Sequence, residues 1–466
     1  MKSQVVIVGA GPAGVMAAFE AVKYGCHVTL IDESPRIGGQ IYRQAANGIA
    51  KRTNIVQKEQ DRKKILMAAF EQISDRIDFL PEATAYAAFP GPELHVTQHN
   101  HSFVFQPKVL ILATGVSEYT VPFSGWTLPG VMFAGGVQAL MKEYGVCAGK
   151  QALVAGAGPL SIAVGAQLVE ANAKVQAIAL LNPLSDMTAK PFSLWAGRQM
   201  IREGFTYLKK LKRSGVPTLN RWRVIRAHGK DCLKAVTLGK MIRNGQAVPN
   251  TEKTIQCDLL AVNYGFSSNS ELARMFGIEV VFNPEFGGWI PQLDVFGGTT
   301  AKGVLIAGDC GGVLGGVAAA ARGSIAGATA AKKFCGKAVD QTTLTAAFAE
   351  LKRHQLFQKA VRKTLHIPFE VYELLDPETH ICRCEGVSLE RLQQSIDEGH
   401  HTINAIKRNT RAGMGRCGGR VCLRSVAALL NEKRKLTEIE PMTARPVARP
   451  VTLGSIANQS NCEGQG

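Results

Sequence analysis

The chain lacks the sequence signatures of several broad protein classes. No apolar run in its 466 residues approaches the roughly 20 residues that a membrane-spanning helix needs. The first residues lead directly into a strand-like segment, without the basic region and cleavage site of a secretory signal. Charged residues make up only 20% of the chain and hydrophobic residues 46%, which is typical of a globular protein. We therefore expect a cytoplasmic protein of two or three domains.

Acidic residues are scarce relative to basic ones, and the formal net charge is +17. The basic residues are scattered or form short runs such as residues 209–213, with no helix-turn-helix pattern and no aromatic platform. We therefore expect no nucleic-acid partner. Three explanations of the charge remain open: an acidic protein partner, peripheral contact with the inner face of the cytoplasmic membrane, or a solvated basic surface.

Redox motifs made of neighbouring cysteines are also missing from most of the chain. No C-x-x-x-x-C pair follows Gly38 and Gly39, and no C-x-x-C pair occurs in residues 119–296, which excludes a redox-active disulfide there. Seven of the 11 cysteines are isolated and are expected to be reduced thiols: Cys26, Cys147, Cys232, Cys257, Cys310, Cys335 and Cys462.

A dinucleotide-binding unit is present in residues 1–39. An apolar segment at 4–8 fits a buried parallel strand, and glycines in G-x-G-x-x-G spacing follow it. These glycines permit a tight turn, close approach of a pyrophosphate, and close packing of the next helix. That helix begins at Pro12, and its N-terminal N–H groups favour a phosphate. A second strand at 27–31 leads to an acid that can bind ribose hydroxyls. The predicted binding residues are Gly9, Gly11, Pro12, Ala13, Gly14 and Asp32.

Two further apolar strands end in short motifs. Residues 108–115 end in Ala-Thr-Gly and residues 303–309 in Gly-Asp, before a small-residue helix at 315–331. With the first unit, these motifs resemble the two-dinucleotide-binding-domain flavoproteins, the family of glutathione reductase and ferredoxin reductases. The resemblance covers residues 1–335 and implies FAD at the first glycine loop, with the late aspartate bonding the ribityl and pyrophosphate region. The resemblance also implies further FAD-binding residues, which are Glu33, Gly39, Gln40, Ala85, Ala113, Thr114, Gly115, Gly308 and Asp309.

A second unit of the same kind follows at residues 151–181. The strand at 151–155 leads into a second glycine loop and a helix that runs to about residue 170. In the resembled family this inserted domain binds NAD(P)H. Here Ser161 replaces the third glycine, which predicts a slightly larger gap between helix and strand, and the next strand ends without an acid for a ribose or an arginine for a 2′-phosphate. Whether ATP, NAD(P) or no nucleotide binds is left open. The candidate binding residues are Gly156, Gly158 and Pro159.

The four grouped cysteines lie near the C-terminus as a C-x-C pair, a 32-residue interval and a C-x-x-x-x-C pair. Four thiolates can hold a [2Fe–2S] cluster. Structural zinc is less well matched, because zinc sites usually have C-x₂₋₄-C spacing in both halves; vestigial or free thiols are the remaining alternatives. The predicted metal ligands are Cys382, Cys384, Cys417 and Cys422.

This C-terminal segment resembles the ferredoxin-like [2Fe–2S] domain of bacterioferritin-associated ferredoxin. With the flavoprotein units and the Arg-Pro-containing tail, nearly the whole chain is similar to the α subunits of hydroxyproline and proline dehydrogenases and to the corresponding subunits of opine oxidases and hydrogen cyanide synthase. The resemblance implies electron transfer from an amino-acid-oxidase-like β flavoprotein that oxidises the substrate, here a D-amino or imino acid such as cis-4-hydroxy-D-proline. Further implied partners are a quinone or respiratory carrier and a small ferredoxin-like γ subunit.

Two other functions remain open: a stand-alone NAD(P)H-dependent reductase of a ferredoxin or rubredoxin, and a non-enzymatic scaffold. The predicted fold is α/β, with an FAD-binding Rossmann-like domain, a nested second Rossmann-like domain and a small helical [2Fe–2S] domain. Helices are expected at 58–76, 388–398 and 402–408, an antiparallel section at 79–104 and a closing strand at 258–265. The expected boundaries are 1–118 and 297–335 for the FAD domain, 119–296 for the insert, 336–375 for a helical connector, 376–432 for the cluster domain and 433–466 for the tail.

Overall fold

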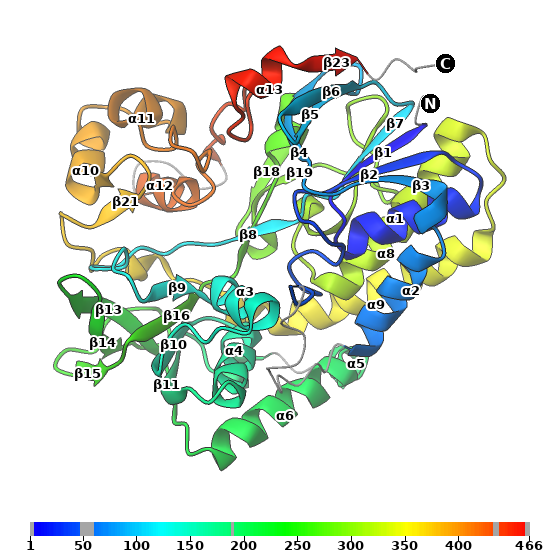
Figure 1. Cartoon of the computed structure of the whole chain (residues 1–466). Coiled ribbons are helices and arrows are strands. Elements are labelled where there is room, and N and C mark those ends of the chain that lie inside the picture. Colours follow the sequence, from blue (N-terminus) through cyan, green and yellow to red (C-terminus); the bar gives the residue numbers. More distant parts are fainter. Residues whose placement is uncertain (1–3, 47–59, 188–190, 432–437, 462–466) are drawn as a thin grey trace.

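The computed structural model describes residues 4–46, 60–187, 191–431 and 438–461. Its first layer is a five-stranded parallel sheet in the order β20-β7-β1-β2-β3. Figure 1 shows helices α1, α2, α8 and α9 gathered around this sheet. The strands are β1 (Val5–Val8), β2 (Val28–Ile31), β3 (Ile77–Leu80), β7 (Val109–Leu112) and β20 (Val304–Ile306). The helices are α1 (Pro12–Lys23), α2 (Gln60–Glu71), α8 (Gly316–Thr329) and α9 (Gln341–Leu365), with a π-helical turn at Ala330–Phe334.

The first sheet is covered on both faces, which explains its continuous apolar strands. Alternate residues of β1 point to opposite faces: Val5 and Ile7 pack in the cluster that includes α1, whereas Val6 and Val8 pack in a cluster with the antiparallel strands that follow β3. Helix α8 approaches α1 closely, since a Cβ at Gly323 would lie 2.1 Å from the carbonyl oxygen of Ala13. This packing joins the two sequence-distant halves of the FAD-type unit.

The second unit repeats the parallel architecture between β7 and β20. Its sheet has the order β12-β11-β10-β16-β9, and helix α4 follows the second glycine loop. The strands are β9 (Val131–Phe133), β10 (Gln151–Gly156), β11 (Lys174–Leu180), β12 (Thr218–Asn220) and β16 (Leu259–Asn263). The helices are α3 (Ala134–Tyr144), α4 (Pro159–Glu170), α5 (Pro191–Ala196) and α6 (Arg198–Arg213).

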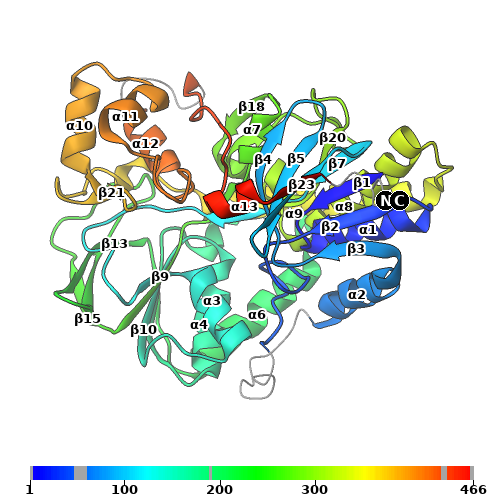
Figure 2. The ribbon, with the colours of Figure 1, turned by 45° about the horizontal axis from the view of Figure 1, so that its top comes forward.

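Smaller antiparallel elements complete both units. One sheet of order β23-β6-β5-β4 receives its outer strand, β23, from near the C-terminus in parallel pairing with β6, and Figure 2 shows α13 and β23 beside β4 and β5. The elements are β4 (Thr84–Phe89), β5 (Glu93–Gln98), β6 (His101–Phe105), α13 (Leu453–Ala457) and β23 (Gln459–Asn461). The others are β8 (Val116–Glu118), β13 (Trp222–Gly229), β14 (Leu233–Lys240), β15 (Lys253–Gln256), β17 (Phe266–Ser268), α7 (Glu271–Met275), β18 (Val280–Asn283) and β19 (Gly288–Pro291).

The cysteine-bearing unit is small and mainly helical. It packs against the segment that joins the two sheets, since Trp126 Nε1 donates a 2.7 Å hydrogen bond to the carbonyl oxygen of His380. Two of its helices begin with side-chain caps, at Ser388 and Thr402. The elements are β21 (His380–Cys382), β22 (Val387–Ser388), α10 (Leu389–Asp397), α11 (Ile403–Thr410) and α12 (Leu423–Leu430).

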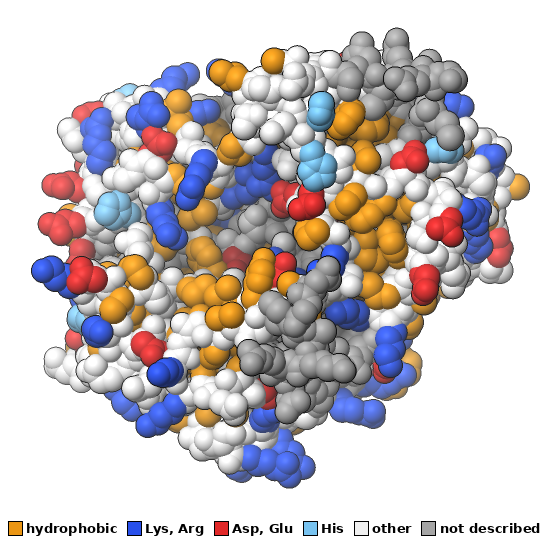
Figure 3. Space-filling model, viewed as in Figure 1, with side chains coloured by type: hydrophobic (Ala, Val, Ile, Leu, Met, Phe, Trp, Pro, Cys, Tyr) orange, Lys and Arg blue, Asp and Glu red, His pale blue; other side chains and the backbone are white. Residues whose placement is uncertain are grey.

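The predicted fold class is confirmed, and the expected elements differ mainly at their ends. Residues 58 and 59 of the first predicted helix lie outside the described residues. Residues 79–80 belong to β3, which pairs in parallel with β2 and is not part of the predicted antiparallel section. Within the described ranges, no helix is long and apolar enough to cross a membrane. Basic side chains are distributed across the face shown in Figure 3 and do not form a single stripe.

Candidate functional site

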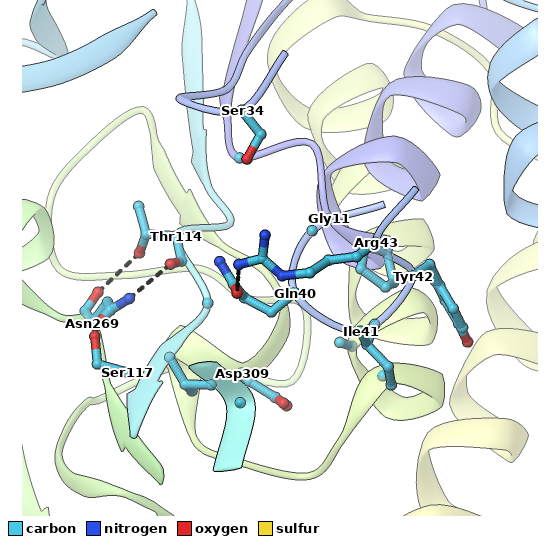
Figure 4. A pocket seen from close by; sticks show the side chains of 18 of the residues that line it. Gly11, Ser34, Gln40, Ile41, Tyr42, Arg43, Thr114, Ser117, Asn269 and Asp309 are labelled. Carbon is cyan, nitrogen blue, oxygen red and sulfur yellow. Dashed lines mark hydrogen bonds between the residues drawn. The ribbon is translucent and has the colours of Figure 1, made fainter. Parts of the chain in front are cut away.

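A cavity of about 700 Å³ opens at the carboxyl ends of β1, β2 and β7. This is the place where open α/β sheets bind nucleotides. Figure 4 shows Gly11, Gln40, Thr114 and Asp309 reaching it from separate segments, and α3, α4 and α6 of the second unit also contribute to its wall. The predicted FAD-binding residues that line it are Gly9, Gly11, Pro12, Ala13, Asp32, Glu33, Gly39, Gln40, Ala85, Ala113, Thr114, Gly115 and Asp309.

Two predicted residues, Gly14 and Gly308, support the cavity wall from behind. A Cβ at Gly14 would lie 1.7 Å from the carbonyl oxygen of Gly9, and one at Gly308 would lie 2.7 Å from Cβ of Ala13. Real Cβ contacts are longer, so both positions require glycine. Helix α1 begins after Gly11 without a side-chain cap, which leaves its first N–H groups available to a phosphate in the cavity.

Two carboxylates fix the loops that carry them. Asp32 accepts hydrogen bonds from the N–H groups of Ala10 at 2.5 Å and Ser34 at 2.7 Å, and Asp309 accepts one from the N–H group of Gly315 at 3.1 Å. Burial raises the pKa of both carboxyls, and the backbone hydrogen bonds oppose that rise. These contacts hold both acids at the cavity wall, Asp32 where ribose hydroxyls would meet it and Asp309 where the family resemblance places the ribityl and pyrophosphate region.

One polar residue of the wall, Asn269, carries no sequence signal for its role. Its Nδ2 donates to the carbonyl oxygen of Thr114 at 3.0 Å, and the Thr114 hydroxyl donates to the carbonyl oxygen of Asn269 at 2.9 Å. Ser117 Oγ donates to Asn269 Oδ1 at 2.7 Å. This network, drawn in part in Figure 4, ties β8 to the end of β17 beside the cavity.

Basic residues that sequence reasoning missed lie at the side of the cavity near α2 and α3. Arg43 pairs with Glu143 at 2.6 Å and also contacts the side chain of Gln40. Lys63 donates to the carbonyl oxygen of Arg43 at 3.1 Å, and burial lowers the pKa of its ammonium group. The Arg43 guanidinium is therefore already engaged by a carboxylate.

The second glycine loop, with Gly156, Gly158 and Pro159, does not line this cavity. Gly158 is buried, and a Cβ there would lie 2.3 Å from Cδ2 of Leu365 at the end of α9. Ser161, in the third glycine position, is fully buried, and its hydroxyl has no hydrogen-bond partner among the described residues. Gly156 and Gly158 therefore face the protein's own chain, whereas Pro159 is exposed.

The strand beside that loop has no ribose acid. In the first unit, Asp32 follows the end of β2, and in the second unit Leu181 follows Leu180 at the end of β11 in the same way. Leu180 and Leu181 are each 1% exposed. The next residue, Asn182, donates from Nδ2 to the carbonyl oxygen of His366 at 2.6 Å. These residues do not fit a nicotinamide dinucleotide.

The four predicted metal ligands come together between β21 and the start of α12. Their thiols lie in two pairs, Cys382 with Cys422 and Cys384 with Cys417, and the members of each pair alter one another's pKa. The Cys422 hydrogen bond, with backbone N–H groups that include that of Gly413, lowers the pKa of Cys382 to about 6, while burial opposes that effect. The same contact, together with burial, raises the pKa of Cys422 well above its ordinary value. Two pairs of neighbouring cysteines fit the four-cysteine ligand set of a [2Fe–2S] cluster.

A site for a single metal ion would need three or more ligand side chains around one point, unlike the two cysteine pairs. No group of three or more His, Cys, Asp or Glu side chains in the described ranges is placed to hold one ion. The described residues contribute no cysteine to the wall of the large cavity. The cysteine group and the cavity are thus two separate sites.

The fold and the two sites define a flavoprotein with two dinucleotide-binding units and an added iron–sulfur domain. Residues 3–333 match the family of pyridine nucleotide-disulphide oxidoreductases, and residues 380–432 match the BFD-like [2Fe-2S] binding domain. The chain belongs to this oxidoreductase family, with FAD and a [2Fe–2S] cluster as the cofactors that its two domains indicate. The predicted resemblance is confirmed.

The chain is similar to known proteins along nearly its whole length. The chain is 30% identical to an opine oxidase subunit from Agrobacterium tumefaciens (strain Ach5), over 97% of this chain and 91% of that protein. It is 30% identical to hydrogen cyanide synthase subunit HcnB of Pseudomonas aeruginosa, over 91% of each. L-proline dehydrogenase from P. horikoshii has the same fold, with a TM-score of 0.70 at 21% identity, over 97% of this chain and 79% of that one.

Proposed function

We propose that this chain is the electron-transferring α subunit of a heteromeric, dye-linked amino- or imino-acid dehydrogenase. Its partner would be an amino-acid-oxidase-like β flavoprotein that oxidises cis-4-hydroxy-D-proline or a related proline, opine or glycine substrate. A quinone or respiratory carrier, with a small ferredoxin-like γ subunit, would complete the system. The whole-chain relatives are named as subunits of an opine oxidase and of hydrogen cyanide synthase, which supports assignment to a multi-subunit oxidoreductase.

One observation carries the proposal: a short bonded route joins the cysteine group to the FAD cavity. Cys422 immediately precedes α12, whose second residue is Arg424. Arg424 Nη1 donates to the carbonyl oxygen of Phe266 at 3.0 Å, and Phe266 lines the cavity. When bound, the flavin supplies two-electron acceptance with single-electron release, and the [2Fe–2S] cluster supplies one-electron transfer. A flavin site and a cluster site in one folded chain fit the role of an electron-transfer subunit.

The cavity is less suited to anchoring an amino acid by itself. A substrate carboxylate is usually held by a bidentate arginine, but Arg43 is already paired with Glu143 at 2.6 Å. This supports substrate oxidation on another subunit. The Arg43 side chain would then act in the wall beside the flavin, where it holds Gln40 against α3.

Co-expression with a gene for an amino-acid-oxidase-like flavoprotein from the same genome tests the proposal. We expect a co-purifying complex with dye-linked activity toward at least one hydroxyproline, proline, opine or glycine substrate. The chain purified alone should retain flavin and iron but lack that activity. Turnover by the isolated chain at the rate of the complex would overturn the proposed division of labour, and rapid anaerobic bleaching of its flavin by NADH or NADPH would favour a stand-alone reductase.

A further inference from the structure

Two arginines from the C-terminal part of the chain reach the FAD cavity. Arg420 lies in the loop of the second cysteine pair, and Arg449 lies in the tail beyond α12. Both line the cavity together with Ala448. All three residues lie outside residues 3–333, which match the flavoprotein family. The cavity wall therefore includes a part that the FAD-binding unit does not supply.

Arg420 is held by contacts to three segments. Its Nη1 donates to the carbonyl oxygen of Cys417 at 2.8 Å, and its Nη2 donates to the carbonyl oxygen of Ala448 at 3.3 Å. Its Nε lies 2.9 Å from Oε1 of Glu271 in α7. The side chain is only 9% exposed, so its planar, multiply bonded guanidinium is fixed in position. Arg420 thus contacts the backbone of a cluster ligand and the cavity at once.

The position of these arginines identifies the end of the cavity that they close. Arg449 lies 3.9 Å from Glu33, the residue after the ribose-binding acid. The N–H group of Ala448 donates at 2.6 Å to the carbonyl oxygen of Tyr86, next to the cavity residue Ala85. Since the acid after the second strand marks the adenosine ribose, the C-terminal segments cover the adenosine half of the site.

We propose that Arg420 and Arg449 are FAD-binding residues, and that Arg420 links occupancy of the FAD site to the integrity of the cysteine site. The three contacts of Arg420 leave two of its five N–H donors and the faces of its guanidinium. A guanidinium can stack on the adenine ring or bond a phosphate oxygen, and either contact would retain FAD. Because Arg420 is positioned by the carbonyl oxygen of Cys417, disorder of that loop after loss of the cluster would displace it. Linkage is reciprocal, so bound FAD would also favour the docked cluster loop.

The test uses the full-length chain and measures FAD affinity and the flavin release rate by fluorescence. Arg420→Ala and Arg449→Ala should each raise the Kd for FAD about tenfold or more, the loss of one charge-assisted contact. The matched control is Arg411→Ala, which removes an arginine of the same domain that is 66% exposed and paired with Glu385 at 2.8 Å, away from the cavity. It should change the Kd by less than about twofold.

A second arm tests the coupling between the sites. Cys384→Ser, which disables the cluster, should accelerate flavin release in the wild-type background by severalfold but add little in the Arg420→Ala background. Arg420→Lys keeps the positive charge but lacks the planar guanidinium with its forked N–H donors, so its flavin release rate should lie between those of the wild type and Arg420→Ala. This variant replaces Arg420→Ala if the alanine variant does not fold. Equal FAD affinity in the Arg420 and Arg411 variants would overturn the binding role. An equal effect of Cys384→Ser with and without Arg420 would overturn the linkage.

Discussion

The guanidinium carbon of Arg424 lies 3.6 Å from the centre of the Tyr119 ring. The Tyr119 hydroxyl in turn shares a 2.5 Å hydrogen bond with that of Tyr372. Both tyrosines are buried, and burial lowers the pKa of Arg424. A cation on a desolvated aromatic face is a strong contact of its kind. This stack fixes the beginning of α12, two residues after Cys422, against the segment that follows β8.

Arg424→Ala should loosen this junction. The variant loses the cation–π contact and leaves the carbonyl oxygen of Phe266 without its donor, a combined loss of about 2–4 kcal/mol. A lower thermal unfolding midpoint and faster proteolysis near residues 376–432 are the expected results. The control is Arg408→Ala, because Arg408 is exposed in the same domain. Identical proteolysis of both variants would contradict the role of the stack.

Asp32→Ala should weaken FAD binding. The substitution removes a charged acceptor for ribose hydroxyls, at a cost of about 1.5–3 kcal/mol, and it also frees the N–H group of Ala10. Titration of flavin-free protein with FAD measures the change. Asp78→Ala, at an exposed position of β3, should bind FAD normally. A chain that is purified without flavin and cannot take it up would refute the FAD assignment.

Serine at any one of Cys382, Cys384, Cys417 and Cys422 should abolish or strongly perturb the cluster. An alkoxide is a harder ligand than a thiolate and holds iron–sulfur clusters poorly. Iron and sulfide analysis with EPR of the reduced protein provides the measurement. Cys232→Ser, at an exposed isolated cysteine, is the control. Zinc without iron after anaerobic preparation would show that the site holds a different metal.

NADH and NADPH should fail to reduce the flavin at a useful rate. Leu180 and Leu181 replace the ribose acid, and Leu365 covers the second glycine of the loop. Anaerobic stopped-flow mixing at millimolar nucleotide follows flavin absorbance directly. Leu365→Ala opens space at Gly158 without restoring an acid, so the flavin of this variant should also remain oxidised. Rapid bleaching in the wild-type chain would show that the loop binds a dinucleotide despite its cover.

Glu118 should make stability depend on pH. It accepts a 3.0 Å hydrogen bond from the N–H group of Gly135, and burial raises its pKa from 4.5 to about 7. Between these values the native state binds the proton more tightly than the unfolded chain, so stability falls as pH rises, by up to about 3 kcal/mol. The free energy of unfolding of Glu118→Gln, measured in urea, should therefore increase relative to that of the wild type as the pH is raised from 5 to 8. Parallel pH profiles for the two proteins would exclude this contribution.

The local parts of the fold and site were predictable because short-range sterics determine them. Gly14 has no room for a Cβ beside Gly9. This steric requirement is visible in the sequence as a glycine at a fixed place in the G-x-G-x-x-G spacing. The grouping of the four cysteines in one domain likewise follows from a ligand set that the sequence displays, whereas the pairs that they form there do not. Strands β1, β2, β7, β10 and β20 of the two parallel sheets were predictable from apolar segments that lead into a glycine loop, a terminal acid or an Ala-Thr-Gly motif. Strands β3, β9 and β12 carry no such mark.

The residues contributed by distant segments could not be predicted. Arg420 and Arg449 look like ordinary basic residues in a chain of net charge +17, and only the docking of the C-terminal segments brings them to the cavity. The cover of Gly158 by Leu365 depends on the path of a 25-residue helix. Asn269 is similar, since its partners Thr114 and Ser117 lie more than 150 residues away.

The return of the C-terminal segment to the first unit has a kinetic consequence. After the cysteine-bearing helices, Ala448 bonds the backbone of Tyr86, and β23 extends the sheet of β4 to β6. The iron–sulfur domain is thus anchored to the flavoprotein body both before its first cysteine and after its last. A domain held at both ends cannot carry charge by swinging between docking positions. Electron exchange between the two sites should therefore be insensitive to solvent viscosity, with a rate determined by fixed distance and driving force.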